Sequence, residues 1–484
     1  MALIDLDNLA LRLERNSMIS IPEYKVKDGK YAVYVIKIAI DSIIWTVEKR
    51  YSDFFTFDLE RFEDRKKSFL PPKKLIGNLD PEFLDERRIE LEKYIRTVIE
   101  LDLWLQRKRK QHALSSLVAH FLDFQEYEVH AIVEDLSLRL GSYGEDWLAL
   151  AVMKPKYFEF TPIELYAITE RMKLAEPTAN GKSIHSCYKI FDFSGDGKVD
   201  IANYVEFLHK VQNLKVRGGR GCIGSSNIIG NTLSFSLSLC KKIKALWVSN
   251  FDVRMIHELY SVRKTCRRVI IHYSMKKISD FFLEPGEILP IENQGKWQSV
   301  DEIDFSFNEI EEVDESISLL CSVRKINLSH NFLTGIGNHL QHLTMLNELN
   351  LSNNSIKSLD SWYTRMGNVK RLYLAGNRIC SLKGLQKLYS LEYLDITDNN
   401  IATADDVRPV CTLPCLDHLI LKGNPVQQVI EYRTKVLELF GERFAEMRLD
   451  SRKPDQREVD TILVRLALRK AREEKEEQIR GKTL

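Results

Sequence analysis

The side chains best suited to chemistry are basic residues placed beside aromatic rings and prolines near the N-terminus. Arg50 and Tyr51 are adjacent, Lys73 follows a pair of prolines, and Arg87 comes shortly afterwards. A guanidinium can grip a phosphate through two parallel hydrogen bonds, and an ammonium adds a point charge. The ring of Tyr51 offers a flat face to a sugar-like ring. These residue types predict a phosphate-binding site.

Net charge and motifs limit the other functions of this 484-residue chain. Lys and Arg number 70 and Asp and Glu number 69, so bulk attraction to nucleic acid is excluded and an anionic partner must meet a local patch. The sequence has no His-Glu-x-x-His, Gly-x-Ser-x-Gly, Walker or kinase motif set. We therefore expect a protein that is not an enzyme and uses no cofactor.

The cysteines and the apolar runs indicate the compartment. Eight cysteines are scattered through a long chain without zinc-finger spacing, which is typical of reduced core residues and predicts no metal site. The N-terminus carries acids instead of a basic leader, and no run of eighteen apolar residues occurs. We expect a soluble protein of the cytoplasm.

Strands and helices must position the phosphate site. Residues 18–48 alternate β-branched and aromatic residues in two runs separated by Asp41-Ser42, which predicts a hairpin. Helical spacing follows over 53–65, the proline pair then forces an extended loop, and Asp80-Pro81 opens a second helix. A further helix over 114–124 closes the unit.

This order of elements, with Leu-Pro-Pro-Lys between two arginine elements, resembles the phox-homology (PX) domain family over residues 10–126. PX domains have a three-stranded sheet followed by helices and read phosphoinositides in membranes. The resemblance implies that this unit binds phosphatidylinositol 3-phosphate on early or recycling endosomes.

The resemblance also implies a role for each matching residue. Arg50 would bind the 3-phosphate, Tyr51 would stack on the inositol ring, and Lys73 would bind the 1-phosphate. Arg87 would bind the 4- and 5-hydroxyls. The apolar pair Leu75 and Ile76 would enter the bilayer.

Residues 127–240 are expected to be a mostly helical spacer that buttresses the C-terminal half of the chain. Helical patterns cover 129–140 and 162–172, with Thr161 as the N-cap of the second. Asp192 to Asn203 copies much of an EF-hand calcium loop but has Asn where the bidentate Glu belongs, so a glycine turn is favoured over a calcium site. Gly219 to Gly224 fits G-x-G-x-x-G without a helix behind it, which argues against a nucleotide site.

From residue 300 the chain repeats the pattern L-x-x-L-x-L-x-x-N, which predicts leucine-rich repeats of the short class over 300–426. Each leucine-type position should line the core, and each asparagine should satisfy backbone groups where the chain leaves a strand. The repeats end on Asn308, Asn331, Asn354, Asn377, Asn399 and Asn424.

Flanking segments should close the ends of the array, because an open end exposes core. Residues 241–299 fit two degenerate repeats without the asparagine, and 427–455 resemble a C-terminal cap. Residues 456–484 predict a charged helix, for which a partner or coiled-coil helix and a solvated tail are both open.

The concave sheet is the expected working surface of the repeats. Strand residues between the core leucines point outward, and among them Arg371, Tyr373 and Tyr393 are of the types that dominate protein interfaces. We expect these three residues to bind a protein partner, against the alternative of a face that merely tolerates them.

A PX unit, a spacer and short leucine-rich repeats together resemble the nischarin (imidazoline receptor candidate) family. Continuous strings carry the resemblance in both halves, such as Leu165-Tyr-Ala-Ile-Thr-Glu and Tyr432-Arg-Thr-Lys-Val-Leu. It implies an endosomal scaffold that engages integrin tails, Rac or Rab GTPases and kinases to restrain cell migration. The expected fold is α+β and multidomain. The alternative function is a calcium-responsive or regulatory subunit of an enzyme complex.

Overall fold

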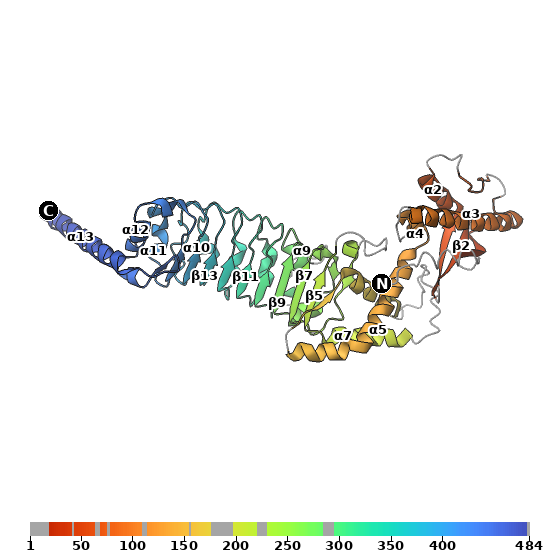
Figure 1. The fold of residues 1–484 in the computed structure, drawn as a ribbon, viewed down its shortest axis with the longest axis horizontal. Coiled ribbons are helices and arrows are strands. Elements are labelled where there is room, and N and C mark those ends of the chain that lie inside the picture. The colour runs from red at the N-terminus through yellow and green to blue at the C-terminus, as the bar shows by residue number, and fades with distance from the viewer. Residues whose placement is uncertain are drawn as a thin grey trace. The chain divides into compact units, whose positions relative to one another are not determined.

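The computed structural model describes residues 19–40, 43–62, 68–74, 78–108, 114–153, 156–175, 197–219, 230–283 and 295–481. They form two compact units. The first comprises Met1–Lys154, Phe160–His209 and Gly218–Phe235, and the second comprises Pro155–Glu159, Lys210–Arg217 and Ser236–Leu484. The expected α+β, multidomain organisation is confirmed (Figure 1).

The first unit begins with the expected sheet of three antiparallel strands. They are β1 (Ile19–Lys27), β2 (Tyr31–Ile40) and β3 (Ile43–Arg50), in the order β1-β2-β3. Alternate residues such as Ile36, Ile38 and Val47 are fully buried, as period-two patterning requires. The register pairs Arg50 with Val33, while the turn at 41–42 lies outside the described residues.

Three helices complete this core: α2 (Tyr51–Arg61), α3 (Pro81–Lys108) and α4 (Ser116–Phe121). α2 begins immediately after β3, two residues before the expected start. The Asp53 carboxylate accepts the backbone N–H of Arg50 at 2.7 Å, which supports this sharp transition. Trp45 Nε1 donates to the Leu122 carbonyl at 2.9 Å and joins the sheet to the chain after α4.

A buried carboxylate connects the two longer helices with the segment before the prolines. Asp58 of α2 is 2% exposed and accepts hydrogen bonds from the Tyr94 hydroxyl at 2.8 Å and the Ser68 hydroxyl at 2.6 Å. Both donors are needed, because an unpaired buried carboxylate is costly. The start of the proline loop is therefore fastened to the core.

The segment after the PX unit contains α5 (Phe124–Met153), α6 (Pro162–Ala175) and α7 (Gly197–Lys210). Thr161 caps α6 as expected: Glu164 accepts its N–H at 2.8 Å, and its hydroxyl accepts the N–H of Glu164 at 3.4 Å. Residues 192–196 of the calcium-like loop and 220–224 of the glycine motif lie outside the described residues. The same stretch also supplies two strands, β4 (Phe158–Phe160) and β5 (Asn213–Arg217).

The second unit is built on an 11-stranded sheet that starts upstream of the regular repeats. From β5 onward each strand pairs in parallel with the next strand of the sheet, and Figure 1 shows the strands stacked edge to edge from β5 through β13. The further strands are β7 (Ala245–Ser249), β9 (Arg268–His272), β10 (Glu302–Asp304), β11 (Lys325–Asn327), β12 (Glu348–Asn350), β13 (Arg371–Tyr373), β14 (Tyr393–Asp395), β15 (His418–Ile420) and β16 (Arg448–Leu449).

The repeat asparagines form a buried ladder between successive turns. Asn354 Nδ2 donates to the carbonyls of Leu328 at 3.0 Å and Leu351 at 2.9 Å, and its Oδ1 accepts the N–H of Leu333 at 3.0 Å. Each bond satisfies a backbone group that no strand partner reaches. Donation by Nδ2 to the turn before and to its own turn recurs at Asn308, Asn331, Asn377, Asn399 and Asn424.

The C-terminal end of the array is closed by α12 (Tyr432–Glu438), β16 and α13 (Gln456–Gly481). Asp450 directly follows β16, and its Oδ1 accepts the N–H of Leu421 at 2.9 Å, as the Tyr373 carbonyl does for the equivalent N–H of Leu351. Arg433 pairs with Glu458 at 2.7 Å and fastens α13 to the cap. The shorter elements are β6 (Phe235–Ser236), β8 (Ile256–His257), α8 (Tyr260–Thr265), α9 (Ser279–Phe282), α10 (Trp362–Arg365) and α11 (Arg408–Cys411).

Candidate functional site

Two of the predicted phosphate-site residues, Tyr51 and Arg87, are in contact and hold the proline loop. The Tyr51 hydroxyl donates to the Pro71 carbonyl at 2.5 Å. The guanidinium carbon of Arg87 lies 4.3 Å from the Tyr51 ring centroid, and Nη2 of Arg87 donates to the Pro72 carbonyl at 2.7 Å. The start of α2, the proline loop and α3 thus converge. Arg50 directly precedes Tyr51 in the chain.

Arg87 is a buried cation, and within the described residues it forms no ion pair. Its side chain sits between the rings of Tyr51 and Phe83, 4.2 Å from the Phe83 centroid, and the residue is only 5% exposed. Its Nε is buried without a hydrogen-bond partner in the described part of the chain. Because a buried unpaired charge is expensive, this arrangement suits an acceptor-rich or anionic ligand.

Arg50 is exposed and stacks on a residue that sequence reasoning missed. Its guanidinium carbon lies 3.6 Å from the centroid of the Tyr31 ring. Asp53 accepts the backbone N–H of Arg50, and no ion pair of the Arg50 side chain occurs among the described residues. The hairpin register could have indicated this contact. Val33 pairs with Arg50, so Tyr31, two residues before Val33 on the same strand, is the diagonal neighbour of Arg50.

The basic residues after the prolines are exposed beside this cluster. Lys73 follows Pro72, whose carbonyl binds Arg87, and Lys74 Nζ lies 3.9 Å from the Phe83 ring centroid. The expected membrane residues Leu75 and Ile76 lie outside the described residues.

Tyr34 is a buried tyrosine whose pKa is influenced by Arg87. Burial raises the pKa of Tyr34 to about 12, while the positive charge of Arg87 acts in the opposite direction. A tyrosine with this pKa is neutral at physiological pH. The positive charges of the cluster therefore receive no compensating negative charge from this side chain.

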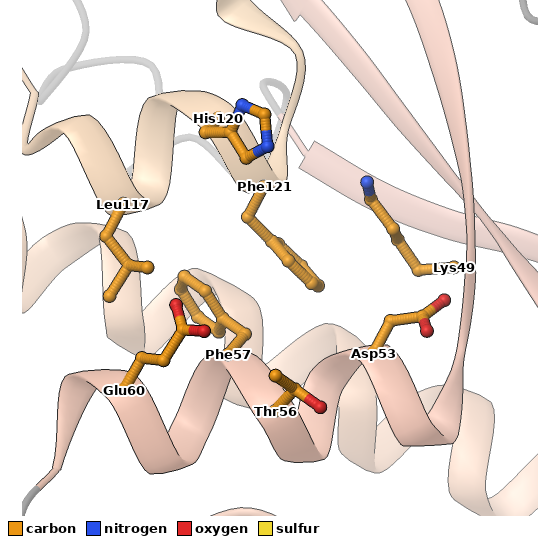
Figure 2. Close-up of a pocket in the computed structure, with 8 residues that line it drawn as sticks. All are labelled: Lys49, Asp53, Thr56, Phe57, Glu60, Leu117, His120 and Phe121. Carbon is orange, nitrogen blue, oxygen red and sulfur yellow. The ribbon is translucent and has the colours of Figure 1, made fainter.

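A separate hollow of about 230 Å³ lies between α2 and α4 (Figure 2). The stacked rings of Phe57 and Phe121, 4.2 Å apart, lie in its middle. Its charged groups are of both signs, so it does not resemble a phosphate site. Its lining residues are Lys49, Asp53, Thr56, Phe57, Glu60, Leu117, His120 and Phe121.

In the repeats, the three predicted partner-binding residues lie on neighbouring strands β13 and β14. The rings of Tyr373 and Tyr393 are 5.1 Å apart, and Tyr393 is 6.0 Å from the ring of His418. Arg371 is exposed and pairs in register with Tyr393. Burial, together with the negative charge of Asp395, raises the pKa of Tyr393. The result is an aromatic row with the exposed cation of Arg371 beside it.

Other kinds of site find no support in the described part of the chain. No cluster of three or more His, Cys, Asp or Glu side chains is arranged there to hold a metal ion. The described cysteines are free thiols. No described helix combines the length and hydropathy needed to cross a bilayer.

Comparison with known proteins identifies two modules. The PX domain model matches residues 39–125, and a leucine-rich repeat model matches residues 343–474. Kinesin-like protein KIF16B of Homo sapiens is 42% identical over 86 residues, which are 16% of this chain and 6% of that protein. Sorting nexin MVP1 of Candida glabrata is 41% identical over 95 residues, which are 17% of this chain and 19% of that protein.

A solved structure of a designed CISK-PX domain is 31% identical, with a TM-score of 0.18, and the match covers 22% of this chain and 96% of that one. The chain spans less than a fifth of the length of either the kinesin-like protein or the sorting nexin. The chain therefore carries an N-terminal PX domain and a leucine-rich-repeat array.

Proposed function

We propose that this protein is a phosphoinositide-binding adaptor, in which the PX domain attaches to a membrane and the repeats hold a protein partner. The observation that carries the proposal is the buried guanidinium of Arg87, which has no carboxylate partner among the described residues and lies on the ring of Tyr51, the residue that follows exposed Arg50. A phosphorylated ring can supply both with oxygen acceptors while its flat face contacts an aromatic ring.

The proposed ligand is phosphatidylinositol 3-phosphate, with Arg50 on the 3-phosphate and Lys73 on the 1-phosphate. Arg87 would bind the 4- and 5-hydroxyls, since a guanidinium held inside the domain can donate to neutral oxygens without a full charge partner. Tyr51 would stack on the inositol ring. Leu75 and Ile76 would enter the bilayer.

We further propose a nischarin-like role at early or recycling endosomes. Sorting nexins among the relatives and the family-like strings in both halves support this assignment. The repeats would engage integrin tails, Rac or Rab GTPases or kinases through Arg371, Tyr373 and Tyr393. A scaffold of this kind would act on cell migration by bringing its partners to one membrane.

Vesicle flotation tests the lipid assignment. The full chain is mixed with phosphatidylcholine vesicles that contain phosphatidylinositol 3-phosphate, the 4-phosphate, the 4,5-bisphosphate or phosphatidylserine. We expect flotation with the 3-phosphate alone. Equal flotation with all anionic lipids would reduce the site to a general basic patch and contradict the proposal.

A calcium arm of the same experiment tests the alternative function. Flotation and melting temperature are measured with calcium and with a chelator. The adaptor predicts no difference, whereas a calcium-responsive subunit predicts a shift in one of them.

A further inference from the structure

One position in each repeat has a left-handed backbone. It immediately precedes the ladder asparagine or its equivalent, and φ there is between 52° and 72°. Residues without a bulky side chain, or with a short polar one, tolerate this conformation best. Along the array the position is occupied by Asn250, Tyr273, Phe307, His330, Asn353, Gly376, Asp398 and Gly423.

Two large aromatic residues occupy this position at a cost. Tyr273 has φ of 54° and Phe307 has φ of 56°. A left-handed conformation is unfavourable for an ordinary residue, whereas the glycine at Gly376 avoids this cost. Folding does not require these rings, because the backbone bond from Tyr273 N–H to the Phe307 carbonyl, 2.8 Å, involves no side chain. The strain therefore points to another use of the rings.

The strained aromatic residues form one exposed surface with His330, which we call the aromatic ledge. Phe307 stacks on His330 with centroids 4.3 Å apart and planes at 11°, and Tyr273 lies 5.7 Å from Phe307. Tyr273 is 62% exposed and Phe307 is 40% exposed. Rings that only filled the core would be covered.

The Asp304 carboxylate is connected to the ledge through His272. Asp304 Oδ1 accepts the Ser306 hydroxyl at 2.6 Å and the Asn327 amide at 3.0 Å, and it is 3.4 Å from His272 Nε2. The ring of His272 is in turn 6.0 Å from that of Phe307. The donors all converge on Oδ1, so Oδ2 has no hydrogen bond within the described residues.

The charged residues around Asp304 are occupied with one another. Glu302 is paired with Arg268 at 2.7 Å, and Glu309 with Lys276 at 3.2 Å. No described Lys or Arg pairs with Asp304 itself, so this carboxylate remains available to a cationic ligand. A planar guanidinium stacks on aromatic rings and forms two parallel hydrogen bonds with a carboxylate, which a compact ammonium cannot do.

We propose that the aromatic ledge and Asp304 form a docking site for a partner protein segment that carries an arginine. The arginine side chain lies along Phe307, and its guanidinium reaches Asp304. The site is in the N-terminal half of the array and separate from Arg371, Tyr373 and Tyr393, so it does not depend on the proposed lipid binding.

A phage-displayed library of random linear peptides tests this site. The library is selected on the immobilised full chain after depletion on the Asp304→Asn chain, in which Asn keeps an oxygen acceptor for Ser306 and Asn327. Enriched peptides are synthesised and their affinities measured by fluorescence polarisation. We expect the enriched peptides to share an arginine, and replacement of that arginine by lysine to weaken binding.

Variants of the ledge separate binding from folding. Phe307→Asn should weaken peptide binding by about tenfold or more, while its melting temperature stays equal or rises, because Asn tolerates the left-handed backbone. Phe332→Ala, at an aromatic residue that is more exposed than Phe307, with 57% against 40%, is the control and should change binding by less than about twofold.

Three results would overturn the proposal. They are enriched peptides without arginine, peptides that bind the Asp304→Asn chain as tightly as the wild type, and a library that yields no binder dependent on Asp304. If Phe307→Asn melts well below the wild type, the ring is structural, and Tyr273→Asn together with Asp304→Asn then decides the binding question.

Discussion

The guanidinium of Arg87 lies across the ring of Tyr51, with 4.3 Å between the guanidinium carbon and the ring centroid. Through Pro71 and Pro72, these two side chains also hold the proline loop by hydrogen bonds of 2.5 and 2.7 Å. A ligand at Arg87 would therefore contact a site whose rings and loop are already positioned. Prior positioning lowers the entropic cost of binding.

Replacing Arg50 by Gln should remove lipid recognition without unfolding the domain. Arg50 is exposed and its side chain packs on the surface ring of Tyr31, so little core is disturbed. Loss of charge-assisted hydrogen bonds worth roughly 1.5–3 kcal/mol predicts about a 10- to 100-fold weaker affinity for vesicles with phosphatidylinositol 3-phosphate. Lys93→Gln, the same charge change at an exposed position of α3, is the control. Unchanged flotation by a folded Arg50→Gln chain would reject the assignment.

Replacing Tyr51 by Phe tests the anchoring of the proline loop. The ring and its contact with Arg87 remain, but the hydroxyl bond to Pro71 is lost. We expect about 1 kcal/mol less stability and a faster release from vesicles, because Lys73 is positioned by this loop. Urea unfolding and surface plasmon resonance measure the two effects. An unchanged dissociation rate would show that the loop is positioned without this bond.

Replacing Asn354 by Ala should destabilise the array. The amide serves two carbonyls at 2.9–3.0 Å and the N–H of Leu333, all buried. Each buried group left unpaired costs about 1–3 kcal/mol, so we expect a loss of at least about 2 kcal/mol in urea unfolding. Asn347→Ala, at an exposed position of the same repeat, should cost less than about 0.5 kcal/mol. Equal losses of stability in the two variants would contradict a stabilising role of the asparagine ladder.

Replacing Tyr373 and Tyr393 together by Ala tests the role of the repeats in targeting. The two rings lie 5.1 Å apart on adjacent strands, and neither is fully buried. We expect lower recruitment of the full chain to endosomes in cells and unchanged affinity for vesicles, because two weak linked contacts strengthen each other. Recruitment equal to that of the wild type at matched expression would show that this surface does not contribute.

Tyr94 should make the PX domain less stable at alkaline pH. Burial, and then the hydrogen bond to Asp58, raises its pKa above the ordinary value. The neutral form therefore stabilises the fold fully below the unfolded pKa of about 10, and this contribution is lost as pH rises from there toward the folded pKa. Tyr94→Phe should be less stable at about pH 7, since Asp58 loses a donor, but lose less further stability by about pH 11. The free energy of unfolding of both chains is measured with urea at the two pH values. An equal loss of stability in the wild type and in Tyr94→Phe would contradict this prediction.

Much of the fold could be predicted because its signals are local. Period-two alternation before Arg50 indicates a strand that is buried on one face, and the asparagine spacing indicates a repeat whose buried turns need the same amide each time. The proline pair likewise restricts its own backbone. Sequence patterns predict less where packing against a neighbouring strand determines the local structure. Residues Asn213–Arg217 form a strand that pairs with β7, although the preceding segment is helical.

The modules, the basic and aromatic residues and the asparagine ladder can be predicted from the sequence, because each depends on side-chain types at fixed spacing. Which of these residues meet depends on the tertiary fold. The burial of Arg87 between Tyr51 and Phe83, the stacking of Arg50 on Tyr31 and the stacking of Phe307 on His330 join residues from different elements. Such contacts depend on how strands and turns align in space. The spacing of residues along the chain does not give the distance between side chains of different elements.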